Sequence, residues 1–131
     1  MEGGLDARIL ATMGVRLVVL SVGGYSLPVR FRIREQAVEC RVPTRSGVGD
    51  RLEEAGEATL VAVAEVGPDL RWLFMRGPAV VVPEPDWEGL RPPPSNQVGP
   101  DDLYQLVRIE LKRIELVDER RGWGFRETVD R

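Results

Sequence analysis

The sequence predicts a mainly β protein, a small barrel of about six antiparallel strands with two short helices. Three observations lead to this prediction. Residues 28–34 alternate strictly between apolar and basic side chains, which is the period of a half-buried strand. Runs rich in β-branched residues recur along the chain, and several end at glycine or proline pairs typical of turns. The 131 residues, 43% of them hydrophobic, suffice for one domain over residues 1–131 with its own core.

Six strands are predicted from these patterns, over residues 15–22, 28–34, 37–42, 58–66, 71–82 and 103–117. The fifth strand contains Gly77-Pro78, a pair that indicates a bulge or sharp bend of the kind that turns a barrel corner. The last one alternates like a strand, but its period slips at Lys112-Arg113. We therefore predict one long bulged strand there, with a helix as the alternative.

The remaining segments are predicted as two short helices, a surface excursion and a tail. One helix is expected between Asp6 and Gly14, and an amphipathic one over residues 45–55. Residues 83–100 hold six of the ten prolines and read as a surface excursion with one helical turn near Trp87. Residues 118–131 form a C-terminal tail.

Composition excludes several classes of function. The formal net charge of −3 argues against nucleic-acid binding, which needs a concentrated basic surface. The chain has no histidine, which excludes histidine-dependent catalytic triads and removes the commonest ligand of transition metals, so no metal site is predicted. Cys40 is the only cysteine and reads as a small buried hydrophobe in a reducing compartment. No signal peptide or membrane helix is evident, so we expect a soluble, cytoplasmic protein.

The segment between residues 38 and 63 contains the most specific local signal. A strand runs into the polar turn Pro43-Thr-Arg-Ser-Gly47, which is followed by a short helix and then by an apolar strand. A hydroxyl-rich turn at the start of a helix presents unpaired backbone N–H groups and is able to hold a phosphate. The simpler interpretation is an ordinary helix cap, in which Thr44 or Ser46 satisfies the first turn.

The order of these segments resembles the pyridoxamine-phosphate-oxidase-like family of flavin-binding split barrels. The resemblance covers nearly the whole chain and depends on the order and spacing of motifs. They are Pro28-Val-Arg-Phe31, Ser46-Gly-Val-Gly-Asp-Arg-Leu52, the acidic link and apolar strand over residues 53–60, Gly77-Pro-Ala79 with Glu84-Pro85, and Val107-Arg-Ile-Glu-Leu111 with Trp123. The resemblance implies a six-stranded antiparallel split β-barrel with two or more short helices. It also implies a homodimer that holds flavin mononucleotide (FMN), or a deazaflavin, between two barrels.

The resemblance also implies which residues would bind the cofactor. Thr44, Arg45 and Ser46 match the turn that holds the flavin phosphate, whereas Val48 stands where the family has its phosphate-binding lysine. Arg45 and Arg51 are the substitutes that we expect, because guanidinium binds phosphate bidentately.

Four further residues complete the expected site, and each has a simpler alternative. Arg30 and Arg32 would lie beside the flavin, or else form a solvated strand face. Trp72 would stand near the flavin ring, or else belong to the core. Trp123 would reach the partner's site, or else anchor the C-terminus.

Two functions follow from these observations. The first is a flavin-dependent oxidoreductase of unknown substrate, in which the cofactor performs the chemistry and no histidine is required. The second is a cofactor-free split barrel that acts as a binding or scaffold module, suggested by Val48 in place of lysine. No catalytic residue is assigned from the sequence.

Overall fold

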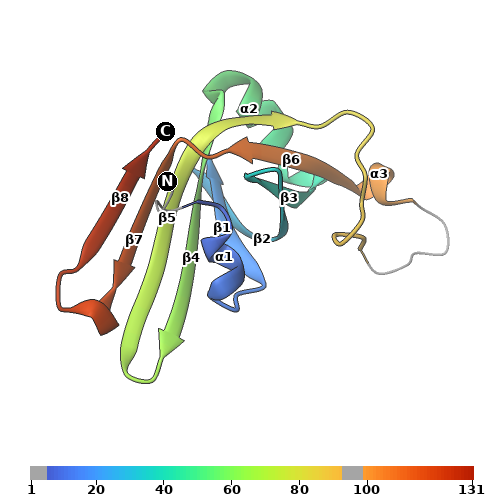
Figure 1. Cartoon of the computed structure of the whole chain (residues 1–131). Helices are drawn as coiled ribbons and strands as arrows, with labels where there is room; N and C mark the ends of the chain where they lie inside the picture. Colours follow the sequence, from blue (N-terminus) through green and yellow to red (C-terminus); the bar gives the residue numbers. More distant parts are fainter. Residues whose placement is uncertain (1–5, 93–98) are drawn as a thin grey trace.

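The computed structural model describes residues 6–92 and 99–131, which form one antiparallel β-barrel with a two-stranded extension (Figure 1). The strands are β1 (Leu17–Val22), β2 (Tyr25–Arg34), β3 (Ala37–Pro43), β4 (Glu57–Val66), β5 (Asp69–Val81), β6 (Tyr104–Glu110), β7 (Arg113–Asp118) and β8 (Arg126–Asp130). The sheet order is β4-β1-β2-β3-β6-β5-β7-β8, and β4 also pairs with β5. Six strands therefore close into a barrel, as predicted, while β7 and β8 extend the sheet beyond β5.

Helices lie near both ends of the barrel. The helix α2 (Val48–Ala55) follows the 3₁₀ turn η1 (Thr44–Ser46), and α1 (Ile9–Thr12) precedes the first strand. In Figure 1, α2 lies at the top of the barrel and α1 near its lower part. The short α3 (Pro100–Leu103) leads into β6, and the 3₁₀ turn η2 (Glu119–Arg121) separates β7 from β8. Only α1 and α2 contribute to the core, through the few apolar residues on their inner faces, such as Leu10 and Leu52.

The strand β5 changes its partner halfway along one edge. Residues 71–76 of β5 pair with β7, whereas residues 79–81 pair with β6. Gly77 lies at the change of partner, and a Cβ on it would be only 1.8 Å from the carbonyl oxygen of Glu110. Only glycine fits here, because any side chain would collide with the backbone of β6. The bend that the sequence indicated at Gly77-Pro78 is therefore the corner at which the barrel splits.

The C-terminal third of the chain corrects two expectations. The predicted long strand over residues 103–117 is two strands, because the chain turns at Leu111-Lys112 and β6 and β7 pair with different halves of β5. The slipped period was read as a bulge, but it marks this corner. The predicted tail contains β8, which pairs with β7 along its whole length.

The predicted excursion is a covering segment rather than a free loop. Its residues 93–98 lie outside the described residues. Between Pro83 and Leu90 it contains no helix, only a turn in which the N–H of Leu90 donates to the carbonyl of Trp87 at 2.9 Å. Trp87 and Leu90 are buried against Leu106 on the outside of the barrel. We call residues 84–91 the strap.

The close approach at Gly77 gives a test of the fold. Gly77→Ala should destabilise the protein by about 3 kcal/mol or more, since the Cβ forces the backbones of β5 and β6 apart. Urea unfolding measures the loss. Gly49→Ala is the matched control, because its Cβ would meet only the flexible side chain of Gln105, and it should cost much less. Equal losses in the two variants would contradict the assignment of Gly77 as the corner.

Candidate functional site

The turn that we predict to bind phosphate is present, but the hydroxyl of Ser46 is hydrogen-bonded to neighbouring backbone groups. Ser46 Oγ donates to the carbonyl of Pro43 at 2.6 Å and accepts from the N–H of Val48 at 3.3 Å. These bonds cap the start of α2, which is the simpler interpretation of this residue. The side chains of Thr44 and Arg45 are exposed and make no hydrogen bond with any described residue. Of the three predicted donors, Thr44 and Arg45 remain available to a ligand.

Val48 and Arg51 lie away from that turn's exposed side. Val48 is fully buried in the core, so a lysine at this position would place its ammonium inside the barrel. Arg51 stacks on the ring of Tyr25 at 5.0 Å and donates to the carbonyl of Gly23 at 3.4 Å. Its guanidinium is thereby directed to the β1–β2 turn rather than to Thr44 and Arg45.

Arg32 belongs to a buried ion cluster on the outer face of the barrel. Arg32, Glu39 and Arg108 are direct cross-strand neighbours on β2, β3 and β6. The buried carboxylate of Glu39 accepts from Arg32 at 2.8 Å and from Arg108 at 3.0 Å. Arg32 also donates to the carbonyl of Glu88 in the strap. These contacts hold the strap against the sheet and leave little of Arg32 for a ligand.

The strap is held by two more arginines. Arg34 donates to Asp86 at 3.0 Å, and Arg41 donates to the carbonyl of Leu90 at 3.0 Å while stacking on Tyr104. The N–H of Glu88, together with the Arg34 guanidinium, holds the pKa of the Asp86 carboxyl below its usual range. Two of the alternating arginines of β2, Arg32 and Arg34, therefore bind the protein's own strap.

An apolar face covers the outside of β1, β4 and β5. In an antiparallel barrel the outward side chains are usually polar, so an apolar outer face indicates a contact surface. Val19, Val61 and Phe74 are aligned across three strands, and Trp72 pairs with Val63. Val63 remains 55% exposed and Leu17 48% exposed. We define the apolar face as Leu17, Val19, Val61, Val63, Trp72 and Phe74.

Arg30 borders this apolar face. It is the cross-strand neighbour of Leu17 and also of Arg41, so two arginines stand directly opposite each other on β2 and β3. Arg30 is exposed and makes no hydrogen bond or ion pair with any described residue. A guanidinium beside another one and without an acid is a favourable place for a phosphate.

Trp123 stands at the tip of the β7–β8 hairpin and is 96% exposed. At the loop end of this hairpin, the last residue of β7 is Asp118, a buried carboxylate within 3.4 Å of Arg71 and 3.2 Å of Arg120. The hydrogen bonds from Arg120 lower the pKa of Asp118 against the opposing effect of burial. At 96% exposure Trp123 does not anchor the C-terminus on the described residues, and the C-terminal segment is instead held by the pairing of β8 with β7.

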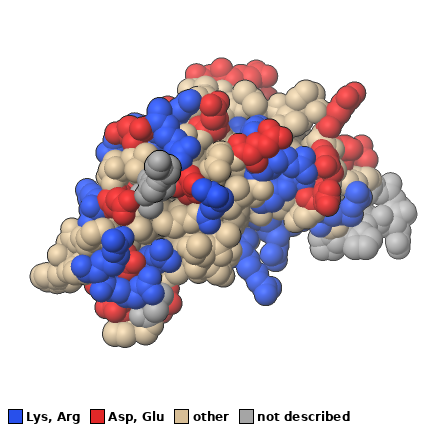
Figure 2. Space-filling model, viewed as in Figure 1, with Lys and Arg blue, Asp and Glu red and all other residues tan. Residues whose placement is uncertain are grey.

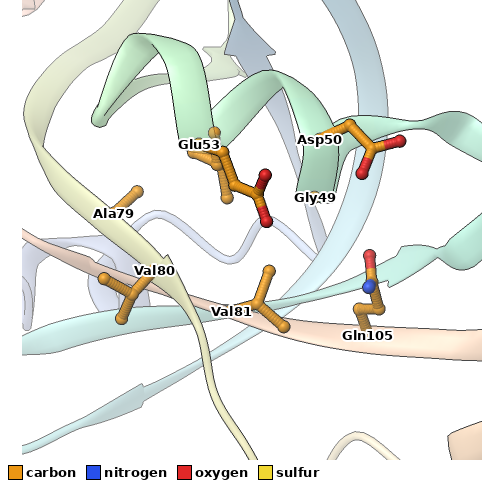
Figure 3. Close-up of a pocket in the computed structure, with 8 residues that line it drawn as sticks. Gly49, Asp50, Glu53, Ala79, Val80, Val81 and Gln105 are labelled. Atoms are coloured by element: carbon orange, nitrogen blue, oxygen red, sulfur yellow. The ribbon is translucent and has the colours of Figure 1, made fainter.

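A hollow of about 380 Å³ lies between α2 and the strands β5 and β6 (Figure 3). The carboxylate of Glu53 points into it from α2, and Asp50 stands near its rim opposite Gln105. Val80 and Val81 form the opposite wall. With two acids and no basic residue among its lining, this hollow does not suit a phosphate.

The charged side chains on the visible face are mixed in sign. Figure 2 shows small groups of basic side chains mixed with acidic ones over the visible face, and they do not merge into one large basic patch. Among the described residues no three acidic, Cys or His side chains gather as a metal site requires, and no helix is long and apolar enough to cross a bilayer. Cys40 is buried as predicted, and burial raises the pKa of its thiol.

The predicted site residues thus fall into separate groups. Arg30, Thr44 and Arg45 lie on the β2–β3 side of the barrel, whereas Trp72 lies on β5, which is three positions from β2 and two from β3 in the six-strand order. The apolar face links the two sides. Sequence reasoning missed most of this face, although β1 and β4 offered a signal: both are apolar at successive positions where alternation with polar residues is expected.

The comparisons with known proteins agree on the fold. No family model matches the sequence, and no curated protein matches it. Solved structures do match, among them a heme binding protein from Mycobacterium smegmatis with 17% identity and a TM-score of 0.66, covering 95% of this chain and 56% of that one. The chain thus spans little more than half of that protein. An FAD binding protein from the same organism has 17% identity and a TM-score of 0.57, with 87% and 97% covered.

A pyridoxamine 5′-phosphate oxidase-related, FMN binding protein from Nostoc punctiforme is also similar, with 13% identity and a TM-score of 0.58, covering 92% of this chain and 82% of that one. At these identities the likeness concerns the fold. The chain has the fold of the pyridoxamine-phosphate-oxidase-like split barrels, as the order of its motifs predicted.

Asp118 predicts a pH dependence of stability. Because its pKa is lowered in the folded protein, the stabilisation is present above the unfolded pKa of about 3.9 and is lost as the pH falls through the lower folded value. Asp118→Asn should be less stable at pH 7 and should lose less stability between pH 5 and pH 2, as measured by urea unfolding. Asp50→Asn, an exposed control, should keep the wild-type acid limb. Parallel acid limbs for wild type and Asp118→Asn would refute this role.

Proposed function

We propose that the protein is a flavin-binding oxidoreductase that works as a cytoplasmic homodimer and holds flavin mononucleotide over the apolar face. The observation that carries the proposal is the apolar face itself, which presents Trp72 and Phe74 on β5 and has the unpaired Arg30 at its border. The names of two neighbours, an FAD binding and an FMN binding protein, support a flavin as the ligand.

The residues of the face fit the ring of a flavin. The isoalloxazine ring is flat and largely apolar, so it requires an aromatic or aliphatic wall from which water is excluded. Trp72 and Phe74 are half-buried on the same face of β5 and flanked by valines of β4. This wall also restricts water around the ring. The flavin supplies the hydride chemistry when bound, and the protein binds and orients it.

Arg30, Thr44 and Arg45 are suited to bind the phosphate of flavin mononucleotide. Arg30 on β2 is the cross-strand neighbour of Leu17 on β1, and Val63 on β4 is that of Trp72 on β5. Because β1 pairs with β4, Arg30 and Trp72 are three strand spacings apart, about 14 Å along the barrel surface. That span suits an extended mononucleotide. Arg45 and Thr44 follow directly on β3, whose Arg41 pairs with Arg30. Together they offer charged and neutral donors in place of the family's lysine.

A second copy of the chain would complete this site. An apolar face that wraps three strands of a barrel leaves one side of any bound ring open to solvent. Packing the same face of a second copy over it would close that side, since a twofold interface joins identical surfaces. The buried single thiol of Cys40 is in keeping with the reducing environment of the cytoplasm.

A cofactor-free binding module is the second candidate. The family's lysine is replaced by the buried Val48, and two of the expected phosphate donors are engaged elsewhere: Ser46 by its own backbone and Arg51 by Tyr25 and Gly23. A deazaflavin would use the same ring wall and phosphate donors as FMN. The experiments below separate these alternatives.

Flavin binding is tested by titrating the purified protein with FMN and following flavin fluorescence. We expect the wild type to quench it, and Trp72→Ala and Arg30→Gln each to weaken binding about tenfold, since the first removes the ring wall and the second a charged donor. Leu103→Ala, an exposed apolar residue outside the face, should bind as the wild type does. A colourless protein that takes up neither FMN nor a deazaflavin would favour the cofactor-free module.

The dimer is tested by sedimentation at micromolar concentration. The wild type should sediment as a dimer and Val63→Glu as a monomer, because the variant places an uncompensated charge in the centre of the apolar face. Val80→Glu, which changes an exposed valine outside the face, should remain dimeric. A monomeric wild type would exclude a site shared between two chains.

A further inference from the structure

A row of polar side chains borders the apolar face on the side of α2. Ser26, Ser21, Thr59 and Arg76 are successive cross-strand neighbours on β2, β1, β4 and β5. All four point outward, because the residues beside them in each strand, such as Leu20, Leu60 and Met75, are buried in the barrel. We call these four residues the hydroxyl–arginine row.

Arg76 is electrostatically unsatisfied. Its cross-strand neighbour on β7 is Arg113, and like charges in directly opposed positions destabilise a sheet. Arg113 is compensated by Asp130 at 3.0 Å and by Glu115 at 3.9 Å. The guanidinium of Arg76 is exposed and has no acid or hydrogen-bond partner among the described residues. An anion at Arg76 would relieve the repulsion that the sheet otherwise bears.

The hydroxyl groups next to Arg76 have hydrogens to donate. Ser21 and Ser26 share one hydrogen bond of 2.6 Å, which uses one of their two hydroxyl hydrogens and leaves the other. The hydroxyl of Thr59 makes no hydrogen bond with a described residue. Neutral donors beside a guanidinium are the combination that binds phosphate or carboxylate oxygens.

There is room for such a group at the row. Ser21 and Thr59 line a hollow of about 330 Å³ that is bounded by the β1–β2 turn and the end of α2. Glu57 also lines this hollow. Its carboxylate repels an anion inside the hollow, and Arg76 is not one of the lining residues, so the anionic group would lie outside the hollow, between Thr59 and Arg76.

We propose that the hydroxyl–arginine row binds the anionic group of an amphipathic substrate whose apolar part lies on Val19 and Val61. These two residues are cross-strand neighbours and lie two residues from Ser21 and Thr59 of the row, so an apolar body and an anionic group at that spacing meet matching surfaces. As a substrate site this rests on the proposed function, because the flavin would lie over the same face. The substrate class is an aromatic or aliphatic phosphate or carboxylate.

The test uses phenyl phosphate as the probe, with phenol as its uncharged counterpart, in calorimetric titrations of the protein with and without FMN. The wild type should bind phenyl phosphate, and Arg76→Gln should weaken it at least tenfold while leaving phenol unaffected. Arg76→Lys, which keeps the charge but loses the planar fork, should give an intermediate affinity. Arg91→Gln, an exposed arginine in the strap, is the matched control and should bind as the wild type does.

The outcomes separate this site from the flavin. Arg76→Gln should retain wild-type FMN affinity, because the phosphate of the cofactor is assigned to Arg30. A wild type that takes up no flavin but binds phenyl phosphate through Arg76 would overturn the oxidoreductase and keep the anion site. Equal phenyl phosphate affinity in wild type and Arg76→Gln, or no binding at all by the wild type, would overturn the anion site whatever the flavin result.

Discussion

The approach of β5 to the carbonyl of Glu110 at Gly77 is the constraint on which the rest of the structure depends. On one side of this residue β5 belongs to a sheet with β7, and on the other it closes the barrel with β6. One strand thus supports both the closed barrel and the open extension. The outward residues before Gly77 are the aromatic wall and Arg76, so the residues that we assign to ligand binding are positioned by this corner.

The sequence was sufficient for the fold because its turn signals mark nearly every boundary of the first five strands. It failed where one local pattern suits two tertiary arrangements. The slip at Lys112-Arg113 is compatible with a bulge or with a corner, and only the exchange of partners along β5 decides between them. The strand β8 was missed because its sequence, Arg126-Glu-Thr-Val-Asp130, has no apolar alternation, and the edge with which it pairs is provided by β7 beyond the closed barrel.

The candidate site was less predictable than the fold for a related reason. The position of Arg32 on the outer face followed from alternation, but its engagement by Glu39 and by the strap joins segments far apart in the chain. From the sequence, Ser46 suits either a ligand donor or a helix cap. Its hydroxyl donates to the carbonyl of Pro43 and accepts from the N–H of Val48, which favours the cap. The apolar face was invisible as a unit because its members come from three strands, each of which resembles ordinary core.

The strap has a consequence for how the chain folds. The seam between β3 and β6 joins residues such as Cys40 and Val107, whereas β1–β2, β2–β3 and β4–β5 are local hairpins. Long-range pairing is slow because loop closure must precede its contacts. Arg32, Arg41 and the buried Trp87 hold the strap across this same pair of strands, so the junction that we expect to form last also carries the contacts of the strap. We expect the hairpins to fold early and this seam to set the rate.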